Sequence, residues 1–158
     1  MNLISAMTLN KYIAIAIGIS AVIYISYSIR KYARDKILFH CAVIDFITYT
    51  RQQIAFFCTP TARIIASYKD PILSSNGFFD KKGLENNRYL DQRGRKLLEE
   101  FFSRLGKSSS EEQTANCDYI IAGLNTLIDE YKNDAEKKYK AYSSLTLILG
   151  LMLLILLV

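Results

Sequence analysis

The chain has 158 residues, enough for one small domain, and its 51% hydrophobic content is concentrated toward the two ends. The formal net charge is +5, from 20 basic and 15 acidic residues, and much of the excess lies beside the apolar segments. This placement favours an anionic membrane surface over nucleic acid as the reason for the basic balance. The three cysteines, Cys41, Cys58 and Cys117, have no paired spacing, which indicates a reducing compartment.

The first predicted element is a transmembrane helix over residues 12–29, preceded by an extracytoplasmic segment over residues 1–11. The 18 residues from Tyr12 to Ile29 are uncharged and would span roughly 27 Å as a helix, close to the thickness of the hydrocarbon core. A cleaved signal peptide is the alternative. The stretch is long for one and runs into Arg30 without a small-residue cleavage site, so an uncleaved anchor is the better interpretation.

A cytoplasmic helical bundle is predicted over residues 30–140. The first helix is expected to continue to Phe57, and Thr59-Pro60 then predicts a cap and first residue of a short second helix. Asp70-Pro71 repeats this signal, and Asn76-Gly77 predicts a turn that opens a loop-like region over residues 77–87. The predicted apolar stripe of the first cytoplasmic helix comprises Ile37, Cys41, Ile44, Ile47, Ile54 and Phe57.

A stronger helix is predicted to follow the loop and to end at Gly106 as its C-cap. Its apolar face is formed by Leu90, Leu97, Leu98, Phe101, Phe102 and Leu105.

The last predicted element is one unbroken helix from Ser110 to Val158, with Ser110 as N-cap and Gln113 completing a capping box. Its first half is amphipathic, and every residue over 141–158 is uncharged, so the helix is expected to pass from the bundle into the membrane.

The orientation of the two predicted anchors follows from the basic residues beside them. Eight of these lie on the bundle side and only Lys11 on the other, which places the bundle in the cytoplasm and both termini outside. The eight are Arg30, Lys31, Arg34, Lys36, Lys132, Lys137, Lys138 and Lys140.

The sequence offers little catalytic chemistry. His40 is the only histidine, and its neighbour Cys41 points about 100° away on a helix, so the two do not form a nucleophile–base pair. A zinc site is not expected without CxxC spacing or a second histidine, and no glycine-rich phosphate loop is present in the sequence. We therefore predict no catalytic residue, cofactor or metal.

Two patterns suggest contacts, either between the two anchors themselves or with partner proteins. Small residues recur at helical spacing within the anchors and would let membrane helices approach closely: Ala14, Gly18, Ala21, Thr146 and Gly150. Asp45, Tyr49 and Arg51 form a polar cluster on the first cytoplasmic helix, either as a docking surface or as a solvated face.

Several motifs resemble those of the stage III sporulation protein AB family. They are the run Phe102-Ser-Arg-Leu105-Gly106, then Gln113, then Lys140-Ala-Tyr-Ser-Ser144-Leu145, Gly150-Leu151 and the aliphatic tail, together with Thr59-Pro60 after the first cytoplasmic helix. Members usually have Asp three residues after the glycine of the Leu-Gly element, where this chain has Ser109, and often Gly at the position of Thr146.

The resemblance implies a non-enzymatic membrane scaffold in the secretion-like channel between mother cell and forespore, needed for endospore formation. It implies a bundle similar to the cytoplasmic domains of the F-type platform protein of type II secretion, docking a separate cytoplasmic ATPase. The other membrane components of the channel, the lipid bilayer and possible further copies of the chain would be its partners, in the mother-cell membrane around the forespore.

Two other functions remain open from the residues. An oligomeric pore or transporter acting alone is one, although neither anchor contains the charge that marks an ion path. A membrane-tethered enzyme built on His40 and a cysteine is the other.

Overall fold

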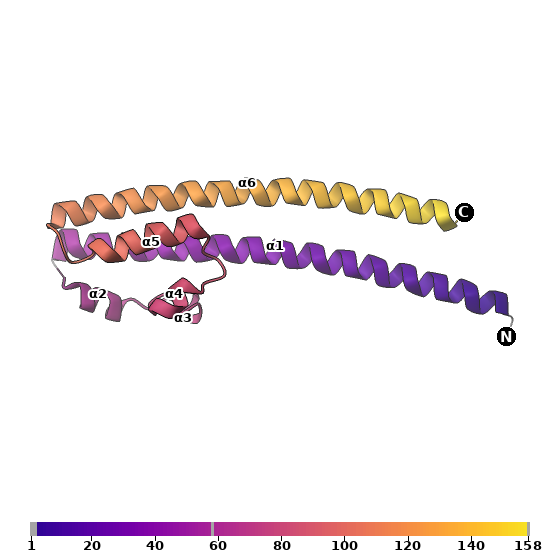
Figure 1. Ribbon diagram of the computed structural model, residues 1–158, viewed down its shortest axis with the longest axis horizontal. Coiled ribbons are helices and arrows are strands. Elements are labelled where there is room, and N and C mark those ends of the chain that lie inside the picture. Colours follow the sequence, from indigo (N-terminus) through magenta and orange to yellow (C-terminus); the bar gives the residue numbers. More distant parts are fainter. Residues whose placement is uncertain (1–2, 58, 158) are drawn as a thin grey trace. The chain divides into compact units, whose positions relative to one another are not determined.

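The regular secondary structure is all α-helical over the residues that a computed structural model describes, 3–57 and 59–157. The helices are α1 (Leu3–Phe57), α2 (Thr61–Ser67), α3 (Pro71–Ser75), α4 (Lys81–Glu85), α5 (Gln92–Arg104) and α6 (Ser110–Leu157) (Figure 1). The all-α fold, the continuous first helix and the unbroken last helix are confirmed; Val158 and Cys58 lie outside the described residues. No proline falls within α1 or α6, so each helix keeps its backbone hydrogen bonds throughout.

The chain divides into two compact units, and α1 and α6 contribute to both. One unit consists of Met1–Ala33 with Asn133–Val158, and the other is the bundle unit, Arg34–Lys132. Over the described residues, none of the helices combines the length and the apolar character that crossing a membrane requires.

The core of the bundle unit is built around phenylalanines from α1, α5 and the turn after α3. Phe46 meets the rings of Phe78 and Phe101 edge to face, with ring centroids 5.6 and 6.2 Å apart. Edge-to-face pairs add stability beyond the burial of their area, because each positive ring edge meets a negative ring face. Other members of the core include Phe39, Val43, Ile47, Leu73, Leu98, Cys117, Ile120, Leu124 and Leu127.

The predicted apolar stripe of the first cytoplasmic helix was partly wrong. Ile47 and Ile54 are buried as expected, but Cys41 and Phe57 are exposed. The buried face of α1 is instead centred on Phe39, Val43 and Phe46. The large rings occupy the core, and they rotate the helix away from the isoleucine stripe that simple spacing suggested.

Two of the predicted helix starts have different outcomes. At α3 the Asp70 carboxylate accepts a 2.8 Å hydrogen bond from the Leu73 N–H and Pro71 is the first residue, as predicted. At α2 the prediction is off by one residue: Pro60 is the N-cap, and no side chain caps the helix. The Thr59 hydroxyl donates instead to Gln53 Oε1 at 3.0 Å.

Candidate functional site

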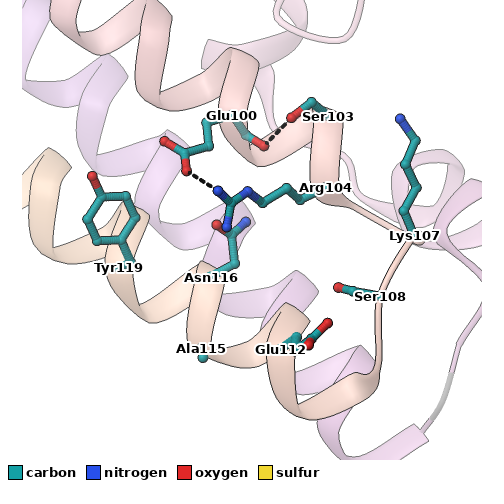
Figure 2. Close-up of a pocket in the computed structure, with 9 residues that line it drawn as sticks. All are labelled: Glu100, Ser103, Arg104, Lys107, Ser108, Glu112, Ala115, Asn116 and Tyr119. Atoms are coloured by element: carbon teal, nitrogen blue, oxygen red, sulfur yellow. Dashed lines mark hydrogen bonds and ion pairs between the residues drawn. The ribbon is translucent and has the colours of Figure 1, made fainter.

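The bundle unit contains an open groove of about 730 Å³ between α5, the α5–α6 loop and the start of α6 (Figure 2). It is lined by residues of both charges together with apolar surface of their side chains, and the lining includes Glu100, Arg104, Lys107, Glu112, Asn116 and Tyr119.

On the α5 side, the side chains of the groove are held by contacts within the helix. Glu100 and Arg104 form an ion pair with a 3.0 Å separation of Oε1 and the guanidinium nitrogen, and the Ser103 hydroxyl donates to the Glu100 carbonyl at 2.8 Å. On the α6 side the Tyr119 side chain is 58% exposed. An open groove with an exposed aromatic ring beside paired charges is suited to contact with another protein, because rigid aromatic side chains contribute strongly to interfaces.

The α5–α6 loop is shaped by Gly106 and Gln113, two of the residues that carry the family resemblance. Gly106 has a φ of +77°, and a Cβ at this position would lie 2.7 Å from Thr61 Oγ1. The Gln113 side chain accepts from the Gly106 N–H at 2.8 Å and donates to the Ser108 carbonyl at 2.7 Å. Gln113 thereby fixes the loop that forms one wall of the groove.

The predicted capping box at Ser110 was wrong. Ser109 precedes the helix, and its hydroxyl accepts from the Glu112 N–H at 3.3 Å, which is the arrangement of an N-cap. The Ser110 hydroxyl donates to the Ile54 carbonyl at the end of α1, also at 3.3 Å. Consecutive serines made the cap ambiguous in the sequence, and the contact with α1 decides between them. Leu105 is the C-cap of α5, with Gly106 one residue later.

A second polar cluster lies where α1, α5 and α6 meet. Asp91 caps α5, with Oδ1 accepting from the Gly94 N–H at 2.8 Å, while Oδ2 accepts from the Tyr131 hydroxyl at 2.7 Å. The Lys36 ammonium lies 3.5 Å from the centroid of the Tyr131 ring. Burial by itself would raise the pKa of Asp91, but the two hydrogen bonds and the nearby Lys36 and Arg93 charges lower it below its usual value.

His40 lies in the same cluster and is fully buried. Its Nδ1 lies 2.8 Å from the Lys36 carbonyl oxygen, which can only accept, so Nδ1 carries the proton of the neutral ring. Burial lowers the pKa of His40, and the Lys36 charge lowers it further, against opposing contributions from the hydrogen bond and Asp91. Its ring meets Tyr131 edge to face, with centroids 5.0 Å apart.

The two cysteines that the structure describes, Cys41 and Cys117, are free thiols. Burial raises the pKa of the Cys117 thiol to about 11, which keeps it protonated at neutral pH. Cys41 is exposed. No group of three or more potential metal ligands occurs among the residues that the structure describes.

The predicted polar cluster on α1 does not share one face. Tyr49 turns toward α2, where its hydroxyl lies 3.2 Å from Ser67 Oγ and its ring packs against Tyr68. The Asp45 charge also acts on Tyr68, as one cause of the raised pKa of that phenol after burial and Asp70. Arg51 points to α6 and forms a 2.7 Å ion pair with Asp118.

The residues predicted to pack membrane helices are only partly described. A Cβ at Gly18 would meet no atom within 4 Å, and Ala21 is exposed. Ser144 donates to the Lys140 carbonyl at 3.1 Å, and Leu145 is exposed. The side-chain environments of Ala14, Thr146 and Gly150 lie outside the described residues.

Two arrangements were not predicted from the sequence. Asp91 followed by a helix of charged and apolar residues carries a readable N-cap signal, but nothing in the sequence pairs its second oxygen with Tyr131. The groove likewise depends on how the α5–α6 loop folds back toward Thr61.

A comparison with known protein families finds a match over the part of the chain that contains the groove. The model of the stage III sporulation protein AB family matches residues 80–158, half of the chain, which include α5, the groove and all of α6. No curated protein and no solved structure was found to match the chain. The chain therefore belongs to the stage III sporulation protein AB family, and its role is in sporulation.

Proposed function

We propose that the protein is a non-enzymatic scaffold of a secretion-like channel between mother cell and forespore, and that its bundle docks the cytoplasmic ATPase of that channel. The observation that carries the proposal is the groove itself. It is open and lined by residues of both charges, and its lining residues, which lie between Glu100 and Tyr119, fall within the family-matched region. The family is not known as one of enzymes, which supports a binding role.

Support for docking comes from how rigidly the groove is held. Gln113 ties the loop to α6 through two hydrogen bonds, and the α5 wall is anchored to the core by the fully buried Leu98 and Phe101. A rigid surface loses little conformational entropy on binding, so its contacts translate more fully into affinity.

The proposal includes two membrane anchors, over residues 12–29 and 141–158. Both segments are uncharged. Large apolar side chains are exposed within them, among them Ile17, Ile23, Tyr24, Ile148 and Met152. Apolar surface of this extent is usually covered by lipid or by partner proteins. With basic residues flanking the bundle side, the bundle would face the cytoplasm, where the ATPase is.

The test is co-purification from sporulating cells together with deletion of the gene. The affinity-tagged full-length protein, solubilised in detergent, should retain the ATPase and membrane components of the channel, and its absence should block spore development. Recovery of the protein by itself, with normal spore yield in its absence, would contradict the proposal.

The same preparation addresses the alternative of a pore acting alone. Purified protein in liposomes should give no conductance, because the predicted anchors contain no charge to mark an ion path. Conductance from the purified chain would favour that alternative.

A further inference from the structure

A group of basic residues lies at the edge of the apolar segments, within the unit formed by residues 1–33 and 133–158. The group has five basic residues, all exposed, and the acidic residues near them in this unit are Asp134 and Glu136. Glu136 forms a 2.7 Å ion pair with Lys140. The five basic residues are Arg30 and Lys31 on α1 and Lys137, Lys138 and Lys140 on α6.

A contact between Arg30 and Tyr139 brings the two helices together at this level. The Arg30 guanidinium carbon lies 3.9 Å from the centroid of the Tyr139 ring. Stacking of this kind uses the face of the guanidinium, and its N–H donors point outward in the plane. They stay available to an anion, next to the adjacent lysines of the same unit.

The apolar surface beside this basic cluster indicates which kind of anion would bind there. The exposed side chains of Tyr27 and Leu145 begin an apolar surface within about two turns of the basic residues on each helix. A ligand that satisfies both surfaces has a negatively charged head and an apolar tail. A phospholipid has this form, whereas a nucleic acid or a free phosphate ion would leave the apolar surface uncovered.

We propose that Arg30, Lys31, Lys137 and Lys138 form a binding site for the phosphate headgroup of anionic phospholipids, such as phosphatidylglycerol, at the inner surface of the membrane. The site rests on the membrane anchors of the proposed function. It gives the protein a lipid preference in addition to simple insertion. Each basic side chain near a membrane surface is expected to increase the preference by about fivefold at most, and screening by salt should reduce it.

The experiment uses the full-length protein reconstituted in phosphatidylcholine vesicles. Trace spin-labelled phosphatidylglycerol or phosphatidylcholine is added, and the ratio of their association constants is obtained from the motionally restricted fraction of each label. The wild-type ratio should favour phosphatidylglycerol. In Lys137→Gln/Lys138→Gln it should fall severalfold, and Arg30→Gln should lower it further.

The matched control is Lys81→Gln/Lys82→Gln, which removes the same charge from two exposed lysines of α4. Its ratio should remain that of the wild type. Inorganic phosphate at matched ionic strength should leave the wild-type ratio unchanged, and displacement of the labelled lipid by phosphate would overturn the assignment to a lipid.

Failure of the site and failure of the anchors give different results. Protein that does not float with the vesicles, or that alkaline carbonate strips from them, would overturn both. Protein that resists carbonate but shows no preference, or an equal loss in the α4 control, would overturn only the lipid site.

Discussion

The hydroxyl of Tyr131 donates a 2.7 Å hydrogen bond to the carboxylate of Asp91, forty residues earlier in the chain. The same carboxylate caps α5 through the Gly94 N–H. The Asp91 side chain thus caps the start of α5 and joins this helix to α6. The Tyr131 ring of α6 also contacts the Lys36 ammonium of α1. The start of α5 is fixed by this junction, and its end is fixed by the loop that forms the groove.

Tyr131→Phe should destabilise the bundle, because it leaves an Asp91 oxygen without its donor in a half-buried setting. The expected loss is about 1–2 kcal/mol, as for other partly buried hydrogen bonds to a charged group. Thermal unfolding of the full-length protein in detergent measures it. Tyr119→Phe is the control, since that exposed ring should lose its hydroxyl without loss of stability. Equal melting temperatures for wild type and Tyr131→Phe would contradict the role given to this bond.

Gly106→Ala should lower stability by roughly 1–3 kcal/mol, because an L side chain at positive φ is strained and its Cβ would approach Thr61 Oγ1. Adding Thr61→Ala should recover the part of the lost stability that the contact causes. The part caused by the strained φ should remain lost. The matched glycine control is Gly18→Ala, where the new Cβ meets nothing within 4 Å. A Gly106→Ala protein as stable as Gly18→Ala would show that the loop adopts another conformation.

His40 should make stability depend on pH below its usual pKa of 6.5. Burial lowers the pKa of His40 in the folded protein, so as the pH falls below 6.5 the unfolded chain binds a proton that the folded protein does not. The contribution of neutral His40 to the free energy of unfolding is fully present above pH 6.5. It is lost as the pH falls through the pKa of His40 in the folded protein. His40→Gln should flatten the slope of unfolding free energy below pH 6.5.

Cys41→Ser, at the exposed neighbouring position, should keep the wild-type slope whatever its absolute stability. An unchanged slope in His40→Gln would assign the pH dependence to other groups. The slope is the decisive quantity, because the glutamine variant can also alter packing.

Lys107→Glu should weaken docking of the ATPase. Lys107 is an exposed cation in the groove loop, and reversal of a charge at an interface is expected to reduce affinity by roughly tenfold or more. Co-purification yield and spore counts measure the effect. Lys81→Glu on α4 makes the same charge change outside the groove and should behave as the wild type. Normal yields from Lys107→Glu would exclude this part of the groove from the interface.

The sequence was informative where a local rule determines the structure. Uninterrupted helical periodicity predicted α1 and α6, and the Asp70-Pro71 pair predicted the start of α3. The turn at Asn76-Gly77 was also correct, since Gly77 has a φ of +63°.

Prediction failed where contacts distant in the sequence decide the outcome. The choice between Ser109 and Ser110 as cap depends on α1, whose Ile54 carbonyl binds Ser110. Tyr49 and Arg51, two positions apart on a helix, point about 200° apart, but the partners they meet, Tyr68 and Asp118, could not be predicted from the sequence. The region 77–87 contains the short helix α4, whose Asp80 N-cap makes no side-chain hydrogen bond and so gave little local signal.

The most direct test of the account is site-specific photo-crosslinking from the groove in sporulating cells. A photoreactive amino acid replaces Tyr119, and the matched probe replaces Lys81 on α4. The account predicts a crosslink to the cytoplasmic ATPase from position 119 and none from position 81. Crosslinks from position 119 only to extracytoplasmic proteins would contradict both the orientation of the bundle and its role as the docking surface.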